Sequence, residues 1–248
     1  PDKTKLSKRH GATSLTWYQE AGYIREGVNN YLALLGWSFD GSSEFFTLSD
    51  LAEKFSVERI NSTPAVFDIV RLEHFNAHHL KNMDIEEKTS LMISYVKRYM
   101  PDLKYDAALF NRERVRGILL ALGDRLKKLS DFALYAAPFI NAEISYADEV
   151  INKTKKDFPR EAFIEGIDGL AEILEKSEPF TAENLEAILR EGRIKNLNFS
   201  KSVSIIRSAL TGQNVSPGIF DVILLTGRES SVNRIKNYKR VMSATYEK

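Results

Sequence analysis

From Asp84 onward, apolar side chains recur every three to four residues, and no stretch alternates apolar and polar residues as a half-buried strand would. Clusters of Pro, Gly or Asn separate the periodic stretches, as is typical of loops between helices. We expect helices over residues 85–99, 105–122, 126–137, 146–156, 160–174, 182–190 and 201–210. The expected fold class is therefore mainly α.

Side chains that accept hydrogen bonds from the first backbone N–H groups of a helix mark several helix starts. Thr47 and Asp50, three residues later, match the pattern of a capping box. In this motif each side chain accepts a hydrogen bond from the backbone N–H of the other residue. Single N-caps are expected at Ser14, Asp68 and Thr181. These signals predict helices in the first 80 residues as well.

Composition excludes several classes of protein. With 43% hydrophobic and 28% charged residues, the 248-residue chain is typical of globular proteins and long enough for one large domain or two to three small ones. Its longest apolar run, 132–140, contains Pro138 and falls far short of the roughly 18 residues that a membrane-spanning helix needs. The absence of cysteine excludes a disulfide framework, a thiolate metal site and a cysteine nucleophile.

Three of the four histidines lie close together, at His74, His78 and His79. The i, i+4 spacing of His74 and His78 would place both on one helix face, where they could hold a metal ion. Because neither an HExxH pattern nor a cysteine accompanies them, ordinary surface histidines are the better interpretation, and no metal site is expected.

Positive charge is concentrated locally, although the net charge of the chain is only +1. Residues 111–130 carry a surplus of four positive charges, and residues 228–248 are again basic. Solvated helix faces and nucleic-acid contacts both show this pattern. The cations of the first cluster are Arg112, Arg114, Arg116, Arg125, Lys127 and Lys128.

A short cationic stretch, Lys5-Leu6-Ser7-Lys8-Arg9-His10-Gly11, lies near the beginning of the chain. Two ammonium groups three residues apart, a guanidinium beside the second, and a glycine that lets the backbone turn suit a loop that closes over phosphates. On spacing alone, a solvated cationic arm is the alternative.

The following residues, ATSLTWYQEAGYIREGVNNYLALLGWS at 12–38, favour the phosphate loop. With KLSKR running on into HGA, they resemble the bacterial-type glutamyl-tRNA synthetases, class I enzymes whose KMSKS signature commonly reads KLSKR. The resemblance continues, more thinly, to the end of the chain. It implies that Lys8, which matches the second signature lysine, contacts ATP and stabilises the charge that develops as the adenylate forms, assisted by Lys5. The implied cofactor of the complete enzyme is ATP with Mg²⁺.

In that family the catalytic Rossmann domain, with its HIGH signature and glutamate pocket, precedes this loop, whereas the present chain begins at Pro1. We therefore expect a C-terminal fragment that binds tRNA, holds no ATP by itself and aminoacylates nothing alone. The expected parts are a KMSKS loop with a stem-contact subdomain at 1–85, a first helical anticodon-binding subdomain at 86–136 and a second at 137–248. Together the last two form an all-helical anticodon-binding cage.

Anticodon bases lie unstacked in a loop, where planar, donor-rich arginines can read their edges. Alignment by hand through Leu129 and Phe132 places Arg125 where discriminating members of the family carry the arginine that contacts the third anticodon base. That base is cytosine in glutamate tRNAs and guanine in glutamine tRNAs. We predict that Arg125 favours glutamate tRNA by about 1 to 3 kcal/mol. The alternative is an ordinary surface arginine, because a slip of one helical turn would remove the match.

A second segment, RSALTG at 207–212 followed by SPGIF at 216–220, resembles the family's RxALTG…SPGxF pattern. Gly212 and the Pro-Gly pair predict a rigid turn between two helices. The resemblance implies that the residues around the first anticodon base are Arg207, Ser216, Pro217 and Ile219. A helix-loop-helix corner with only a structural role is the alternative.

Sequence-independent phosphate contacts are expected from Arg112, Arg114, Arg116, Lys127, Lys236, Lys239 and Arg240. The leading hypothesis is the tRNA-recognition part of a glutamate–tRNA ligase, monomeric and cytoplasmic, whose partners are tRNA(Glu) and, through the catalytic domain, ATP and glutamate. One alternative is a non-catalytic helical module that binds tRNA or a protein, with a vestigial KLSKR loop. Another is a ligase of relaxed specificity that also charges glutamine tRNA.

Overall fold

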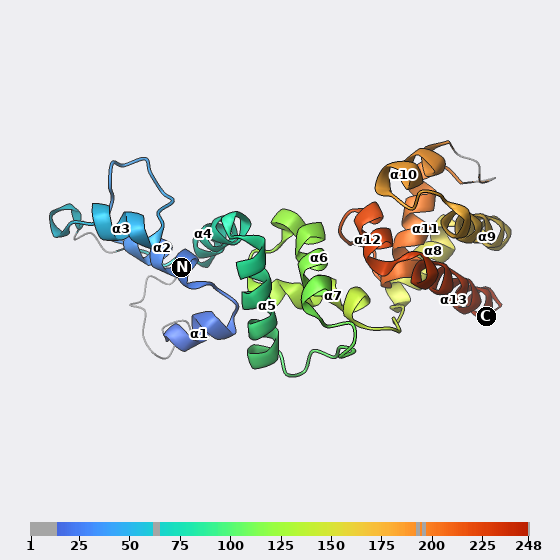
Figure 1. The fold of residues 1–248 in the computed structure, drawn as a ribbon, viewed down its shortest axis with the longest axis horizontal. Coiled ribbons are helices and arrows are strands. Elements are labelled where there is room, and N and C mark those ends of the chain that lie inside the picture. Colours follow the sequence, from blue (N-terminus) through green and yellow to red (C-terminus); the bar gives the residue numbers. More distant parts are fainter. Residues whose placement is uncertain (1–13, 62–64, 192–193, 195–196, 248) are drawn as a thin grey trace. The chain divides into compact units, whose positions relative to one another are not determined.

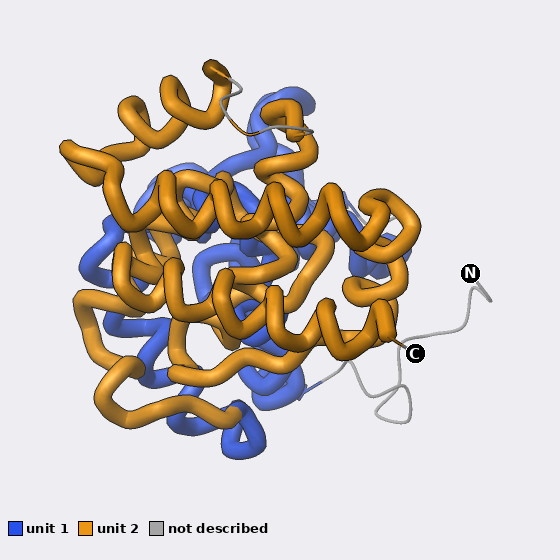
Figure 2. Tube along the Cα trace, turned by 90° about the vertical axis from the view of Figure 1, so that its right-hand side faces the viewer, with its two compact units in different colours: residues 1–103, 122–134 blue, residues 104–121, 135–248 orange. Residues whose placement is uncertain are grey.

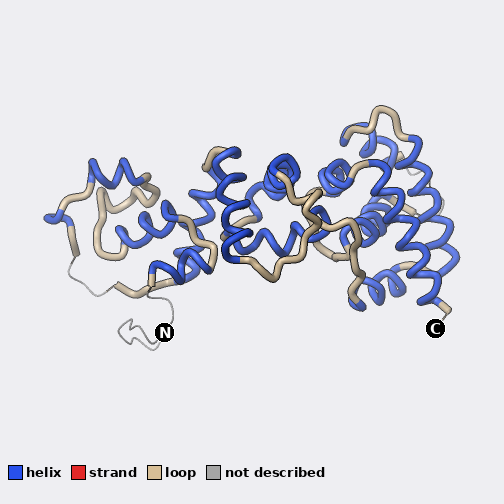
Figure 3. Tube along the Cα trace, turned by 60° about the horizontal axis from the view of Figure 1, so that its bottom comes forward, coloured by secondary structure: helices blue, strands red, loops and turns tan. Residues whose placement is uncertain are grey.

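The computed structural model describes residues 14–61, 65–191, 194 and 197–247. In these ranges every regular element is a helix (Figures 1 and 3), and one isolated antiparallel bridge pairs Trp37 with Ile60. The mainly α fold predicted from the sequence is thus confirmed.

The chain forms two compact units, coloured separately in Figure 2. The first contains the described residues up to 103 together with 122–134, and the second contains 104–121 and the described residues from 135 onward. The chain therefore passes from one unit to the other three times. The finer division at 85 and 136 stays a prediction.

Unit 1 consists of short helices joined by turns. Its elements are α1 (Leu15–Glu20), α2 (Arg25–Leu34), α3 (Leu48–Lys54), η2 (Val57–Arg59), α4 (Ile69–Asn82), α5 (Ile85–Tyr99), η3 (Gly123–Arg125) and η4 (Leu129–Asp131), where η denotes a 3₁₀ helix. Two further helices, α6 (Arg112–Leu122) and α7 (Phe132–Ile140), carry the chain between the units.

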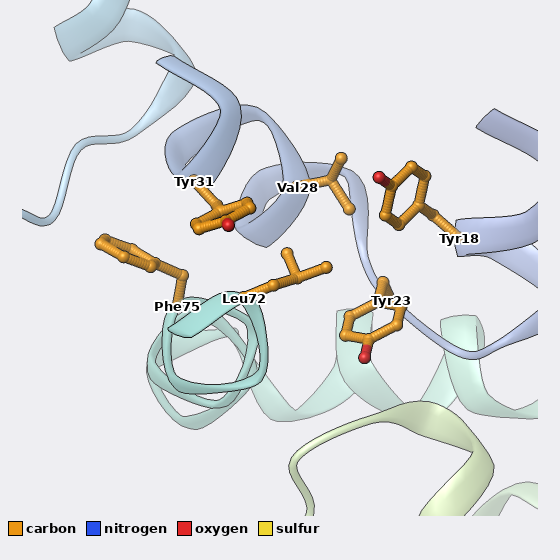
Figure 4. Close-up of a cluster of buried hydrophobic side chains, with 6 residues drawn as sticks. All are labelled: Tyr18, Tyr23, Val28, Tyr31, Leu72 and Phe75. Atoms are coloured by element: carbon orange, nitrogen blue, oxygen red, sulfur yellow. The ribbon is translucent and has the colours of Figure 1, made fainter. Parts of the chain in front are cut away.

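One hydrophobic core cluster of unit 1 lies between α2 and α4 (Figure 4). Val28 and Tyr31 on α2 face Leu72 and Phe75 on α4, and both α4 side chains are fully buried. The rings of Tyr31 and Phe75 lie 6.0 Å apart between centroids, which is within the range of favourable aromatic contact. This packing fixes α4, and α4 in turn carries polar side chains that contact the segment after residue 122.

Unit 2 is built around α11. Its remaining elements are α8 (Asp148–Asp157), α9 (Arg160–Lys176), α10 (Ala182–Arg190), α11 (Phe199–Thr211), α12 (Ile219–Thr226) and α13 (Arg228–Tyr246). Helix α11 packs against α9, α12 and α13, and its Ile206 and Leu210 side chains have no exposed surface. The helix is therefore held firmly up to its last turn.

The capping signals were read correctly. The side chains of Thr47 and Asp50 each accept from the backbone N–H of the other, as a capping box requires. Ser14, Asp68 and Thr181 cap α1, α4 and α10 respectively.

Two predicted helix starts were wrong. The helix expected from 105 begins only at Arg112, because the Asp106 carboxylate accepts from Ala108 N at 2.8 Å and the Asp106 N–H donates to the Ile140 carbonyl. The helix expected from 126 begins at Phe132. Before it, the Asp131 carboxylate accepts from both Lys127 N and Lys128 N, which favours a tight 3₁₀ turn.

Among the described helices, none combines the length and the apolar character that crossing a membrane requires. The described residues as a whole include no group of three His, Asp or Glu side chains arranged to hold a metal ion. The His78 ring stacks on Phe45 with centroids 3.6 Å apart, and His79 Nε2 lies 2.9 Å from Asn30 Oδ1. These two histidines are thus engaged in packing and hydrogen bonding.

Candidate functional site

The turn after α11 in unit 2 has a conformation that only glycine adopts without strain. Gly212 has φ of +65°, and a Cβ atom there would overlap the carbonyl oxygen of Ser145. The Thr211 hydroxyl donates to the Arg207 carbonyl at 2.7 Å and accepts from Gln213 N at 3.1 Å. The turn predicted from the RSALTG and SPGIF segments is therefore present and closely tied to α11.

Arg207, near the end of α11, contacts Ser216 in this turn. The Arg207 Nε–H donates to Ser216 Oγ at 3.0 Å, and that hydroxyl donates onward to the Pro217 carbonyl at 2.9 Å. Ser216, Pro217 and Ile219 are buried, whereas Arg207 is half-buried. Desolvation by this burial lowers the pKa of the Arg207 guanidinium, which nonetheless stays charged because its ordinary value is so high.

The Nε contact orients the guanidinium of Arg207 without using its two terminal nitrogens. Within the described residues, neither Nη atom makes a hydrogen bond. A planar guanidinium that is held through Nε can donate two parallel hydrogen bonds to a ligand from its two Nη atoms. Arg207 and Ser216, expected from the sequence to act together, are thus in direct contact.

An exposed aliphatic side chain beside this pair was not anticipated. Val215 immediately precedes Ser216 in the turn, and 69% of its surface is exposed. An exposed apolar side chain in this turn could pack against the face of an unstacked base. No sequence signal distinguished Val215 from a core valine, so only the structure identifies it.

Arg125 lies in unit 1, in the short helix η3, and its side chain is exposed. Among the described residues, its guanidinium has one contact, a 3.4 Å approach of Nη1 to the Leu122 carbonyl. The neighbouring Asp124 carboxylate pairs with Lys81 at 2.6 Å, and both of these side chains are exposed. Arg125 is therefore available to a ligand.

The basic residues at 111–130 are divided between the two units. Arg112, Arg114 and Arg116 belong to unit 2, whereas the remaining cations belong to unit 1. Arg112 and Arg116 are exposed, but Arg114 is half-buried and its Nη1 donates to the Leu225 carbonyl. Arg114 is thus partly committed to fixing the end of α12.

The basic side chains predicted near the C-terminus have partners on unit 2. Lys239 donates to both carboxylate oxygens of Asp168 at 2.7 and 2.8 Å, and Lys236 lies 3.9 Å from Glu175. Arg240 donates to Asn237. Exposed pairs of this kind are weak and exchange easily for a phosphate. Their phosphate role stays a prediction, and Lys5 and Lys8 lie outside the described residues.

Two family models match the chain. Residues 89–239 match the model described as an anticodon binding domain. Residues 1–74 match the model described as the catalytic domain of class I tRNA synthetases (E and Q). The first match includes both Arg125 and the turn that carries Arg207 and Ser216.

Curated relatives match over nearly the whole chain. Glutamate–tRNA ligase of Moorella thermoacetica is 33% identical over 245 residues, which is 97% of this chain and 48% of the relative. Glutamate–tRNA ligase of Borrelia recurrentis is 33% identical over 236 residues, which is 94% of this chain and 46% of the relative. The chain spans about half the length of the curated relatives it matches.

The fold also matches a solved structure. A glutamate tRNA ligase from Elizabethkingia meningosepticum superposes with a TM-score of 0.79 over 98% of this chain and 49% of that chain. The sequence identity is 22%, so this likeness concerns the fold alone.

Proposed function

Since the chain belongs to the anticodon-binding domain family and is related along its length to glutamate–tRNA ligases, as its sequence indicated, we propose that it is the tRNA-recognition part of such a ligase. The observation that carries the proposal is the Arg207 guanidinium, fixed by Ser216 at one edge and open at the other. In this proposal the partner is tRNA(Glu), and the protein acts as a monomer in the cytoplasm.

The complete enzyme would join glutamate to tRNA in two steps. ATP and glutamate form an adenylate with release of pyrophosphate, and the acyl group then passes to the tRNA 3′ end. Lys8, assisted by Lys5, would hold the ATP phosphates, which Mg²⁺ accompanies, once a catalytic domain excludes water from them. A purely vestigial KLSKR loop is not favoured, because residues 1–74 match the catalytic-domain model.

Two separate positions would read the anticodon. Arg207 would donate from its open edge to the first base, while the buried neighbours Ser216, Pro217 and Ile219 keep the turn rigid. Arg125 would donate to O2 or N3 of cytosine at the third position. Guanine there would present its N1 and N2 donors to the arginine where cytosine presents the acceptors N3 and O2, which is unfavourable. This arrangement favours glutamate tRNA over glutamine tRNA and argues against relaxed specificity.

Phosphate contacts would supply affinity without sequence information. The cations proposed for this role are the exposed Arg112, Arg116, Lys127, Lys236 and Arg240, together with the half-buried Lys239 and the partly engaged Arg114. Each phosphate contact adds about 0.7 to 0.9 to the slope of log affinity against log salt.

Binding of a labelled tRNA(Glu) transcript at several salt concentrations tests the proposal. With four or more phosphate contacts, affinity should fall by at least about 50-fold between 50 and 200 mM salt. Replacing Arg116 with Gln should lower the slope by about 1 and leave base preference unchanged. No binding of tRNA at low salt, or an affinity that salt does not change, would contradict the proposed function.

A further inference from the structure

Asn76, on α4, is a polar side chain with no exposed surface that bridges two distant segments of unit 1. Its Nδ2 donates to the Lys127 carbonyl at 2.5 Å, and its Oδ1 accepts from Ile24 N at 2.8 Å. Both ends of the amide are therefore satisfied, as burial demands. Gly27 on α2 leaves room for it, since a Cβ there would lie 2.7 Å from Asn76 Cα and Oδ1.

The segment held by Asn76 is also tied to the turn between α1 and α2. Leu129 N donates to the Gly22 carbonyl at 2.8 Å, and Ser130 Oγ donates to the Ala21 carbonyl at 2.9 Å. Lys128 pairs with Glu73 of α4 at 2.9 Å, with both side chains about a quarter exposed. Residues 127–130 are thus fixed on two sides, by α4 and by the α1–α2 turn.

Arg125 lies two residues before the carbonyl that Asn76 holds. On its other side, Asp124 is paired with Lys81 of α4 at 2.6 Å. The guanidinium itself has only the long contact with the Leu122 carbonyl among the described residues. The structure therefore fixes the backbone shortly after Arg125, at residues 127–130, while leaving the Arg125 side chain open to a ligand.

We propose that Asn76 is a positioning residue for base reading by Arg125, because its amide holds the backbone at Lys127 against both α4 and Ile24. This inference rests on the proposed function. It goes further by naming Asn76 as a residue on which selectivity at the third anticodon base depends. A donor that distinguishes cytosine from guanine must be placed within about half an ångström, so a loosened backbone loses discrimination before it loses affinity. Asn76 does not touch the RNA.

The test compares two buried asparagines of unit 1. Asn76→Asp replaces the donor to the Lys127 carbonyl with an acceptor and changes almost no volume. Asn30→Asp is the matched control. Asn30 is equally buried, donates to the Glu44 carbonyl at 2.9 Å and accepts from Phe46 N at 3.0 Å, and has no bond to residues 123–131.

The quantity measured is the ratio of dissociation constants for anticodon stem-loops with guanine or cytosine at the third position, using the full chain. An arginine that reads this base should give a wild-type ratio of about 5 to 150, and Arg125→Gln should reduce it towards 1. Asn76→Asp should lower the ratio by roughly threefold or more with an unchanged salt slope. Asn30→Asp should leave the ratio as it is.

A milder variant guards against misfolding of Asn76→Asp. Ser130→Ala removes the bond to the Ala21 carbonyl and the side-chain hydrogen bond with Tyr95, but it leaves the Asn76 bridge intact. It should lower the ratio less than Asn76→Asp while speeding amide hydrogen exchange over residues 126–130. Equal ratios in wild type, Asn76→Asp and Ser130→Ala would overturn the inference. A wild-type ratio of 1 with salt-dependent tRNA binding would overturn both this inference and the role of Arg125. Absence of tRNA binding would instead overturn the proposed function.

Discussion

Replacing Arg207 with Ala is expected to weaken binding of a tRNA(Glu) anticodon stem-loop by about 5- to 150-fold. The substitution removes the open edge of the guanidinium, and it leaves Ser216 Oγ without its donor in a buried position. Discrimination at the first anticodon base should disappear together with affinity. Discrimination at the third base should remain, because Arg125 belongs to the other unit.

Two controls separate base reading from charge. Arg207→Lys keeps the charge but loses the planar fork, so it should lose most of the discrimination and retain part of the affinity. Lys201→Ala removes one exposed charge from the same helix and should cost only a few-fold in affinity at low salt. If Arg207→Ala and Lys201→Ala weaken binding equally, at every base, then Arg207 acts as a charge alone.

Gly22→Ala is expected to destabilise unit 1 by about 2 to 5 kcal/mol. Gly22 has φ of +89°, where an L-residue is strained. In addition, a Cβ would lie 2.5 Å from Ser130 N and 3.0 Å from Leu129 N, both backbone atoms that cannot move aside. The added methyl group would also lengthen the hydrogen bond from Leu129 N to the Gly22 carbonyl.

Gly41→Ala is the matched control for this prediction. Gly41 has φ of +82°, but a Cβ there meets no atom within 4 Å, so only backbone strain of about 1 to 2 kcal/mol applies. Urea unfolding followed by tryptophan fluorescence reports on unit 1, since Trp17 and Trp37 are the only tryptophans of the chain and both lie there. Equal losses in the two variants would show that residues 129–130 do not pack on Gly22.

The sequence predicted most helices because their apolar spacing and caps agree. Helices over 85–99 and 182–190 have the expected bounds. The starts at 105 and 126 were wrong where a local carboxylate, Asp106 or Asp131, bonds backbone N–H groups that a helix would otherwise use. Such competition depends on tertiary contacts, such as that between Asp106 N and the Ile140 carbonyl, which periodicity does not reveal.

The candidate site was predictable only in part. A motif linked Arg207 to Ser216, and the structure places them in contact. The bridge made by Asn76 could not be foreseen, because its partners Ile24 and Lys127 lie about 50 residues away on either side. Similarly, charge counting treated residues 111–130 as one cluster, whereas the chain passes from one unit to the other within it.

If this chain distinguishes the bases of an anticodon, its affinity for tRNA(Glu) depends on the triplet that the anticodon loop carries. The direct test measures binding of the full chain to tRNA(Glu) transcripts in which each anticodon base is changed in turn, at constant salt. Changes at the first and third bases should each weaken binding by about 5- to 150-fold. Equal affinity for all the transcripts would contradict recognition of the anticodon bases by this chain.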